Sequence, residues 1–332
     1  MADLPSIPLP AGASVGTRID THMHVVPPGY KEWMRSLNLW MRDPPEWSVD
    51  GAIELMDREK IRTGILSLST PGVHIDDAVH ACEKTREFNE FSAGVVKRHP
   101  DRFGYFAALP LPHVDEAIAE AVHALDHLWA DGIVLLANVR GTYVGDPSLD
   151  PLMAVLNQRR AVVFIHPTQL PGPAVPGLPA PAIDFLLDTT RAALNIARNG
   201  VLERYPDIKF VLSHGGGFLP YAAQRAARFV APDGRQAVMR RLERPQDLIP
   251  AGTDLLRRFW FDIAMLGTPY AMPALLAFAD PTRITFGSDW PYVSRHYAAY
   301  QSRQFEDFPL SDQMRTAIES GNARKLFPRL DT

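Results

Sequence analysis

The chain has 332 residues, of which 46% are hydrophobic and 22% are charged, and its formal net charge is −4. This composition is typical of a globular protein and excludes global disorder. The lack of a long basic run argues against a nucleic-acid partner. The single cysteine, Cys82, excludes an intrachain disulfide framework and indicates a reducing, cytoplasmic location. The first residues lack the pattern of a signal peptide, and no apolar run reaches the ~18 residues of a membrane helix.

Two irregular segments come first in chain order. Residues 1–16 are predicted to be a flexible, Pro-rich tail with no core to join. A first strand is predicted over 18–24, and an insertion over about 26–48 follows it. The three tryptophans of the insertion, Trp33, Trp40 and Trp47, favour an ordered lid or small insertion over disorder.

The rest of the chain alternates between short apolar runs and amphipathic segments. The predicted strands are 63–68, 103–109, 132–138, 161–166, 208–214, 259–263 and 283–289. The predicted helices are 48–60, 76–98, 114–129, 149–159, 182–199, 219–230, 270–279 and 312–320. The strands are nearly continuous apolar runs, as expected for strands that are covered on both faces.

Eight strand–helix units predict an α/β fold, a (β/α)8 TIM-type barrel, as one domain over 17–332 with an insertion after the first strand. A doubly wound open sheet is the alternative. That fold usually carries a Gly-rich dinucleotide loop after its first strand, where this chain has His22-Met23-His24. Gly215–Gly217 follows a strand and opens a helix, but it does not match GxGxxG and is a weak anion-binding signal.

Residues of metal-ligand type fall at the carboxyl ends of the predicted strands, where barrel enzymes place catalytic groups. His22 and His24 are two apart on one strand and therefore share a face. His166, His214 and Asp289 end the fifth, sixth and eighth strands. One strand-end histidine is more often a packed core residue, but this set together indicates a metal site. Three imidazoles and a carboxylate suit Zn, Mn, Fe or Co, with a position open for water or substrate.

Four motifs then identify a family. IDTHMH, VFIHPT, FVLSHGGG and ITFGSDWPY, in this order, resemble the amidohydrolase superfamily, and the closing GNARKLF is similar to the ending of its amidohydrolase-2 branch. The resemblance covers about residues 17–327 and is greatest to the aminocarboxymuconate-semialdehyde decarboxylase-like group. Within that group, EWSVDGAIELMDREKI followed by ILSLSTPGVH resembles bacterial proteins assigned as 6-methylsalicylate decarboxylases.

The resemblance implies a role for each residue of the set. One divalent ion is expected, zinc with manganese as the alternative, and its ligands would be His22, His24, His166 and Asp289. His214 would be a catalytic histidine near the metal without being a full ligand. Superfamily members with two metals bridge them through a carboxylated lysine on the fourth strand. A single ion is expected here because no lysine lies between Lys97 and Lys209.

The resemblance also suggests a partner subunit. Arg225 matches an arginine that, in the semialdehyde decarboxylase, reaches into the neighbouring subunit's site to hold a substrate carboxylate. A homodimer or higher homo-oligomer is therefore expected, and the alternative is that Arg225 is only a solvated helix residue. A second substrate-binding arginine of that enzyme has no close match, since the nearest candidate, Arg42, is displaced. This departure weakens the semialdehyde as the substrate.

Two reactions suit these residues. In decarboxylation, a 2-hydroxybenzoate such as 6-methylsalicylate would chelate the metal, and the ring carbon would be protonated as CO2 leaves. The donor would be Asp289, tuned by His214, or metal-bound water relayed through His214. In the alternative, hydrolysis of a lactone or amide, the metal would activate water and Asp289 or His214 would take its proton.

The expected substrate pocket is flat and apolar with few polar anchors. The candidate lining residues are Trp290, Ser69 and His74. The alternative for Trp290 is that it only packs in the core, and the alternative for His74 is that it is an ordinary loop residue. A third hypothesis is a non-catalytic protein on an inherited barrel, and the intact ligand set argues against it. We therefore expect a metal-dependent carbon–carbon lyase that acts on a small aromatic acid.

Overall fold

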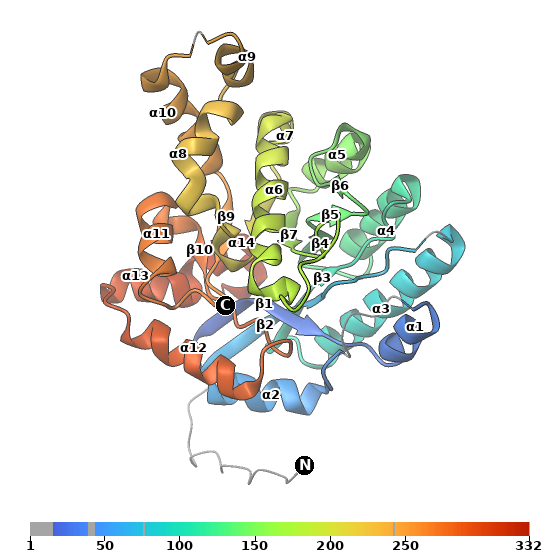
Figure 1. The fold of residues 1–332 in the computed structure, drawn as a ribbon. Helices are drawn as coiled ribbons and strands as arrows, with labels where there is room; N and C mark the ends of the chain where they lie inside the picture. The colour runs from blue at the N-terminus through green and yellow to red at the C-terminus, as the bar shows by residue number, and fades with distance from the viewer. Residues whose placement is uncertain (1–15, 39–43, 76, 242, 332) are drawn as a thin grey trace.

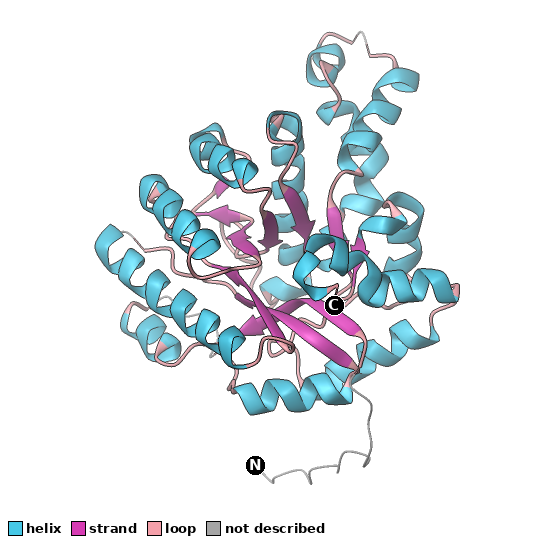
Figure 2. Cartoon of the chain, turned by 180° about the vertical axis from the view of Figure 1, so that it is seen from behind, coloured by secondary structure: helices cyan, strands magenta, loops and turns pink. Residues whose placement is uncertain are grey.

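The computed structural model describes residues 16–38, 44–75, 77–241 and 243–331. Eight parallel strands lie at the centre, and helices surround them (Figures 1 and 2). In the order in which they pair, the strands are β1 (Arg18–Val25), β2 (Ile61–Leu68), β3 (Phe103–Ala107), β4 (Gly132–Leu136), β7 (Val162–His166), β8 (Lys209–Leu212), β9 (Trp260–Asp262) and β10 (Ile284–Thr285).

The eight predicted helices are present, and each begins and ends within a few residues of its predicted position; further helices lie between them. The helices of the described residues are α1 (Tyr30–Ser36), α2 (Val49–Arg58), α3 (Ala78–Arg98), α4 (Val114–Asp126), α5 (Asp150–Gln158), α6 (Asp184–Arg198), α7 (Val201–Arg204), α8 (Leu219–Val230), α9 (Gly234–Met239), α10 (Pro245–Leu256), α11 (Ala271–Phe278), α12 (Arg295–Asp307), α13 (Asp312–Thr316) and α14 (Asn322–Leu326). Helix α2 starts as its sequence predicts, because the Ser48 hydroxyl accepts the Gly51 N–H at 3.0 Å.

The barrel closes between β1 and the segment that follows β10. Met23 forms a parallel bridge with Trp290. The His24 N–H donates to the Trp290 carbonyl at 2.7 Å, and the Asp289 N–H donates to the His22 carbonyl at 2.8 Å. The pairing order together with this closure confirms the (β/α)8 barrel.

Below the closure, aromatic side chains fill the barrel interior. Phe106 and Phe164 stack with their ring centroids 5.4 Å apart. Phe164 also meets the His22 ring edge-on, at a centroid distance of 4.9 Å. The carboxyl end of the barrel therefore rests on a packed apolar floor, and β1 presents its histidines above it.

Several elements differ from their predicted form. Strands β8 and β10 end before His214 and Asp289, which lie in the turns that follow. A small hairpin, β5 (Asn138–Val139) with β6 (Thr142–Tyr143), follows β4, and it was not predicted. Helices α9, α10 and α12 were not predicted either. In α10, Pro250 lies inside the helix and interrupts the helical sequence pattern. In Figure 1, α8, α9 and α10 extend away from the barrel.

The insertion after β1 is partly helical. Helix α1 buries Trp33, whose indole N–H donates to Nε2 of His80 on α3 at 3.2 Å. Trp47 packs beside Phe91. Trp40, Arg42 and residues 1–15 of the predicted tail lie outside the described residues. Among the residues that are described, no helix combines the length and apolar character needed to cross a membrane.

Candidate metal centre

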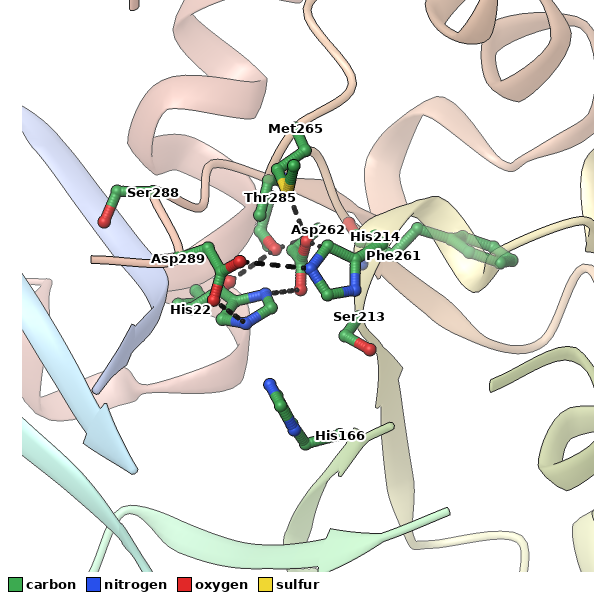
Figure 3. Close-up of polar contacts among 12 residues, drawn as sticks. His22, His166, Ser213, His214, Phe261, Asp262, Met265, Thr285, Ser288 and Asp289 are labelled. Atoms are coloured by element: carbon green, nitrogen blue, oxygen red, sulfur yellow. Dashed lines mark hydrogen bonds and ion pairs between the residues drawn. The ribbon is translucent and has the colours of Figure 1, made fainter. Parts of the chain in front are cut away.

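Four side chains converge above the barrel floor. His22 and His24 come from β1, His166 ends β7, and Asp289 follows β10. One ligand atom from each of the four lies within 4.8 Å of all the others, and all four residues are buried. Figure 3 shows the rings of His22 and His166 and the Asp289 carboxylate around one common point. The structure thus brings together the four residues that the sequence selects as metal ligands.

The spacing of three of these atoms fits one ion. The Nε2 atoms of His22 and His24 are 3.2 Å apart. Oδ1 of Asp289 is 3.1 Å from Nε2 of His24 and 3.3 Å from Nε2 of His22. Ligand atoms about 2.0–2.1 Å from a tetrahedral zinc ion would be roughly 3.3 Å from one another. A single proton cannot satisfy three such acceptors, whereas one divalent ion can.

The outer nitrogen of each histidine is held by an acceptor. Each Nδ1 donates its hydrogen, so that the lone pair of Nε2 faces the common point. The acceptors are Oδ2 of Asp262 for His22 at 2.9 Å, the Ser67 carbonyl for His24 at 3.2 Å and the Pro167 carbonyl for His166 at 2.8 Å. These outer hydrogen bonds therefore turn each Nε2 towards the common point before any ion arrives.

The electrostatics of the cluster favour a cation. Burial disfavours a charged His22, but the Asp262 and Asp289 carboxylates outweigh it and raise the pKa of His22 to about 10. Burial would also raise the pKa of Asp289, yet the nearby His22 charge and three histidine contacts hold it well below its usual range. Burial lowers the pKa of His24 and His166, which keeps them neutral ligands. A divalent ion would take the place of the proton on His22.

His214 lies at the edge of this cluster. Its Nε2 is 3.4 Å from Oδ2 of Asp289, while its Nδ1 is buried without a hydrogen-bond partner in the described part of the chain. The residue has a left-handed φ of 50°, a strained conformation of the kind found at functional sites. The following glycines permit this turn: a Cβ at Gly217 would lie 2.0 Å from the Leu186 carbonyl oxygen.

Asp262 is a site residue that the sequence analysis missed. One carboxylate oxygen accepts Nδ1–H of His22, and the other accepts the backbone N–H of His214 at 3.0 Å and of Ala264 at 2.9 Å. It is fully buried. The signal was present, since Asp262 lies one residue before the end of the predicted strand 259–263, close to the carboxyl end, where the candidate ligands also lie.

The expected substrate-binding residues have different surroundings. Ser69 is buried next to the phenol of Tyr292, whose ring packs edge-on against His24. Trp290 is buried in the main hydrophobic cluster, and its carbonyl pairs with β1. His74 donates Nδ1–H to the Leu111 carbonyl at 2.8 Å. Ser69 and Trp290 therefore lie beside the metal ligands.

Arg225 lies elsewhere. It is on the solvent-exposed side of α8, outside the buried cluster. Figure 1 shows α8 leading away from the barrel towards α9 and α10. Arg225 is therefore not part of the buried ligand cluster.

Replacing Asp262 with Asn is expected to weaken metal binding about 10–100-fold. The Asn carbonyl can still accept from His214 and Ala264, so its NH2 group would face His22 and move the imidazole hydrogen onto Nε2. Competition with a chelator would measure the affinity. Asp280→Asn, on the surface helix cap, is the control and should leave it unchanged. Equal affinities for both variants would contradict the orienting role of Asp262.

His74 predicts a pH effect on stability. Burial lowers its pKa to about 4, below the ~6.5 of an unfolded chain. The unfolded state therefore takes up the proton first as the pH falls. The stabilisation is complete above pH ~6.5 and is lost towards pH 4, by up to about 3 kcal/mol. Between pH 7 and pH 4.5, the free energy of unfolding measured with denaturant should fall more for the wild type than for His74→Gln. Equal decreases for the two proteins would refute the effect of His74.

The whole chain also resembles characterised proteins. The family described as Amidohydrolase matches residues 19–329. "Decarboxylase yanB" from Aspergillus niger is 37% identical, covering 94% of this chain and 88% of its own. The 6-methylsalicylic acid decarboxylase of Penicillium expansum is 33% identical, covering 94% and 97%. A crystal structure of an amidohydrolase II has a TM-score of 0.84 at 28% identity, covering 93% and 99%. The chain therefore belongs to the amidohydrolase family.

Proposed function

We propose that this protein is a metal-dependent, non-oxidative decarboxylase of a small 2-hydroxybenzoate, with 6-methylsalicylate as the first candidate substrate. The observation that carries the proposal is the buried ligand cluster with His214 beside it, in a chain that matches a 6-methylsalicylic acid decarboxylase over 94% of its length. Similarity over nearly the whole of both chains supports a shared reaction type more strongly than a shared barrel does.

The proposed cofactor is one divalent ion held by the cluster His22, His24, His166 and Asp289. Three imidazoles among the ligands favour zinc, and manganese is the alternative. When bound, the ion would supply a positive charge that holds the substrate's carboxylate and its ortho oxygen in the site. The oriented Nε2 atoms and the ionised Asp289 support this assignment.

The reaction needs a proton at the ring carbon that bears the carboxylate. When that carbon is protonated, the bond to the carboxylate breaks, its electron pair returns to the ring, and CO2 leaves. Asp289 and His214 are the proposed proton-transfer residues. Because the pKa of Asp289 is held low, a proton that it delivers must first come from a neighbour. Nε2 of His214, 3.4 Å from Oδ2, is suitably placed to pass it on.

We also propose that the active form is a homodimer or larger homo-oligomer in which Arg225 serves the neighbouring site. The exposed position of Arg225 supports this, as does Tyr221, which is 90% exposed one turn earlier on α8. Exposed aromatic and arginine side chains are enriched at protein interfaces. A cytoplasmic location is proposed from the single cysteine, Cys82.

The reaction type can be tested in D2O. The metal-loaded protein should release CO2 from 6-methylsalicylate and deliver deuterium to the carbon that lost it, which NMR of the product would detect. His214→Ala should keep the metal and lose roughly 10²–10⁴ in rate. If the wild type leaves every 2-hydroxybenzoate intact and opens a lactone or cleaves an amide, the decarboxylase proposal is wrong.

The role of Arg225 can be tested by mixing two inactive variants. In Arg225→Ala the metal ligands are intact, and in His166→Ala the arginine is intact. A mixed dimer would contain one site with both, so mixing should restore part of the activity. The control is to mix His166→Ala with His24→Ala, since both changes damage the chain's own ligand set. No recovery with Arg225→Ala would place Arg225 outside the neighbouring site.

A further inference from the structure

The phenol of Tyr292 is placed unusually beside the metal ligands. Tyr292 comes three residues after Asp289, and its ring meets the His24 ring edge-on, with centroids 5.2 Å apart and planes at 88°. Its hydroxyl is buried beside the Ser69 side chain, but it makes no well-formed hydrogen bond with Ser69 or with any other described residue. The ring is thus held against His24, while its only polar atom has a polar neighbour in Ser69 but no well-formed hydrogen bond.

A buried hydroxyl without a well-formed hydrogen bond needs an explanation. A buried donor without an acceptor loses its hydrogen bond to water and gains none within the protein, so folded proteins rarely contain one. Other buried tyrosines of this chain follow the rule: Tyr30 donates to the Gly72 carbonyl at 3.0 Å and Tyr105 to the Leu128 carbonyl at 3.3 Å. The exception therefore lies next to the metal ligands.

The proposed substrate brings an acceptor to this place. A carboxylate that enters a buried site must find hydrogen-bond donors. Near the ligand cluster, the described residues offer two side-chain atoms without partners that can donate, Nδ1 of His214 and the Tyr292 hydroxyl. The role proposed for His214 is proton transfer. The Tyr292 hydroxyl, which always carries its hydrogen at neutral pH, remains for binding.

We propose that Tyr292 is a substrate-binding residue whose hydroxyl donates a hydrogen bond to the carboxylate of the aromatic acid. This inference rests on the proposed function and names the group of the substrate that the residue recognises. With the carboxylate held between the ligand cluster and Tyr292, rotation of the ring is restricted. The carbon that must be protonated is then kept in place for Asp289 and His214.

A donor to the carboxylate has a distinct kinetic signature. The carboxylate is anionic in the bound acid and loses its charge as it becomes CO2. Tyr292 therefore stabilises the bound substrate at least as much as the transition state. Removing its hydroxyl should raise KM and leave kcat unchanged or slightly higher.

The test is Tyr292→Phe with Tyr105→Phe as the matched control, both loaded with metal. KM for 6-methylsalicylate should rise about 10–100-fold in Tyr292→Phe, the usual loss for a hydrogen bond to a charged group. Its kcat should stay within about threefold of wild type. The inhibition constant of the product, 3-methylphenol, should not change because the product has no carboxylate. Tyr105→Phe should leave all three constants unchanged.

Melting temperatures of the ligand-free proteins complete the test. Tyr105→Phe should melt below wild type because it loses a hydrogen bond, whereas Tyr292→Phe should melt at the same temperature or higher because no bond is lost. An unchanged KM, an equal loss of affinity for 3-methylphenol, or a Tyr292→Phe chain that melts lower or loses its metal would overturn the inference. A wild type that binds and decarboxylates no aromatic acid would instead refute the proposed function.

Discussion

The site depends on the backbone seam that joins β1 to the segment after β10. Across this seam the Asp289 N–H donates to the His22 carbonyl, and the His24 N–H donates to the Trp290 carbonyl. These two bonds place the only carboxylate of the ligand cluster beside two imidazoles. The ligand geometry is therefore set by main-chain pairing, which is stiffer than a loop would be, and it exists before an ion binds.

Asp262 connects the proposed metal site to His214. One of its oxygens orients His22, a proposed metal ligand, and the other holds the backbone of His214, the proposed proton-transfer residue. A shift of β9 would therefore disturb both groups together. This coupling explains why Asp262, a carboxylate outside the ligand cluster, is buried completely at the end of its strand.

The barrel and the clustering of the four candidate ligands could be predicted from sequence because both follow from local patterns: buried strands are apolar runs, and catalytic groups follow their carboxyl ends. The turns at His214 and Asp289 could not, since left-handed φ values for these residues leave no periodic trace. Helix α10 was hidden by Pro250. That the Tyr292 hydroxyl has no partner is a property of three-dimensional packing and has no sequence signature.

The seam also joins residues that are very far apart in the chain: His24 and Asp289 meet across 265 positions. Such a contact is expected to form late in folding, because the chain must lose the entropy of closing a long loop before the contact stabilises it. A chain emerging from the ribosome would carry all three histidines long before the carboxylate that completes the cluster. The complete set of four ligand-type side chains therefore exists only after the two ends of the barrel have met.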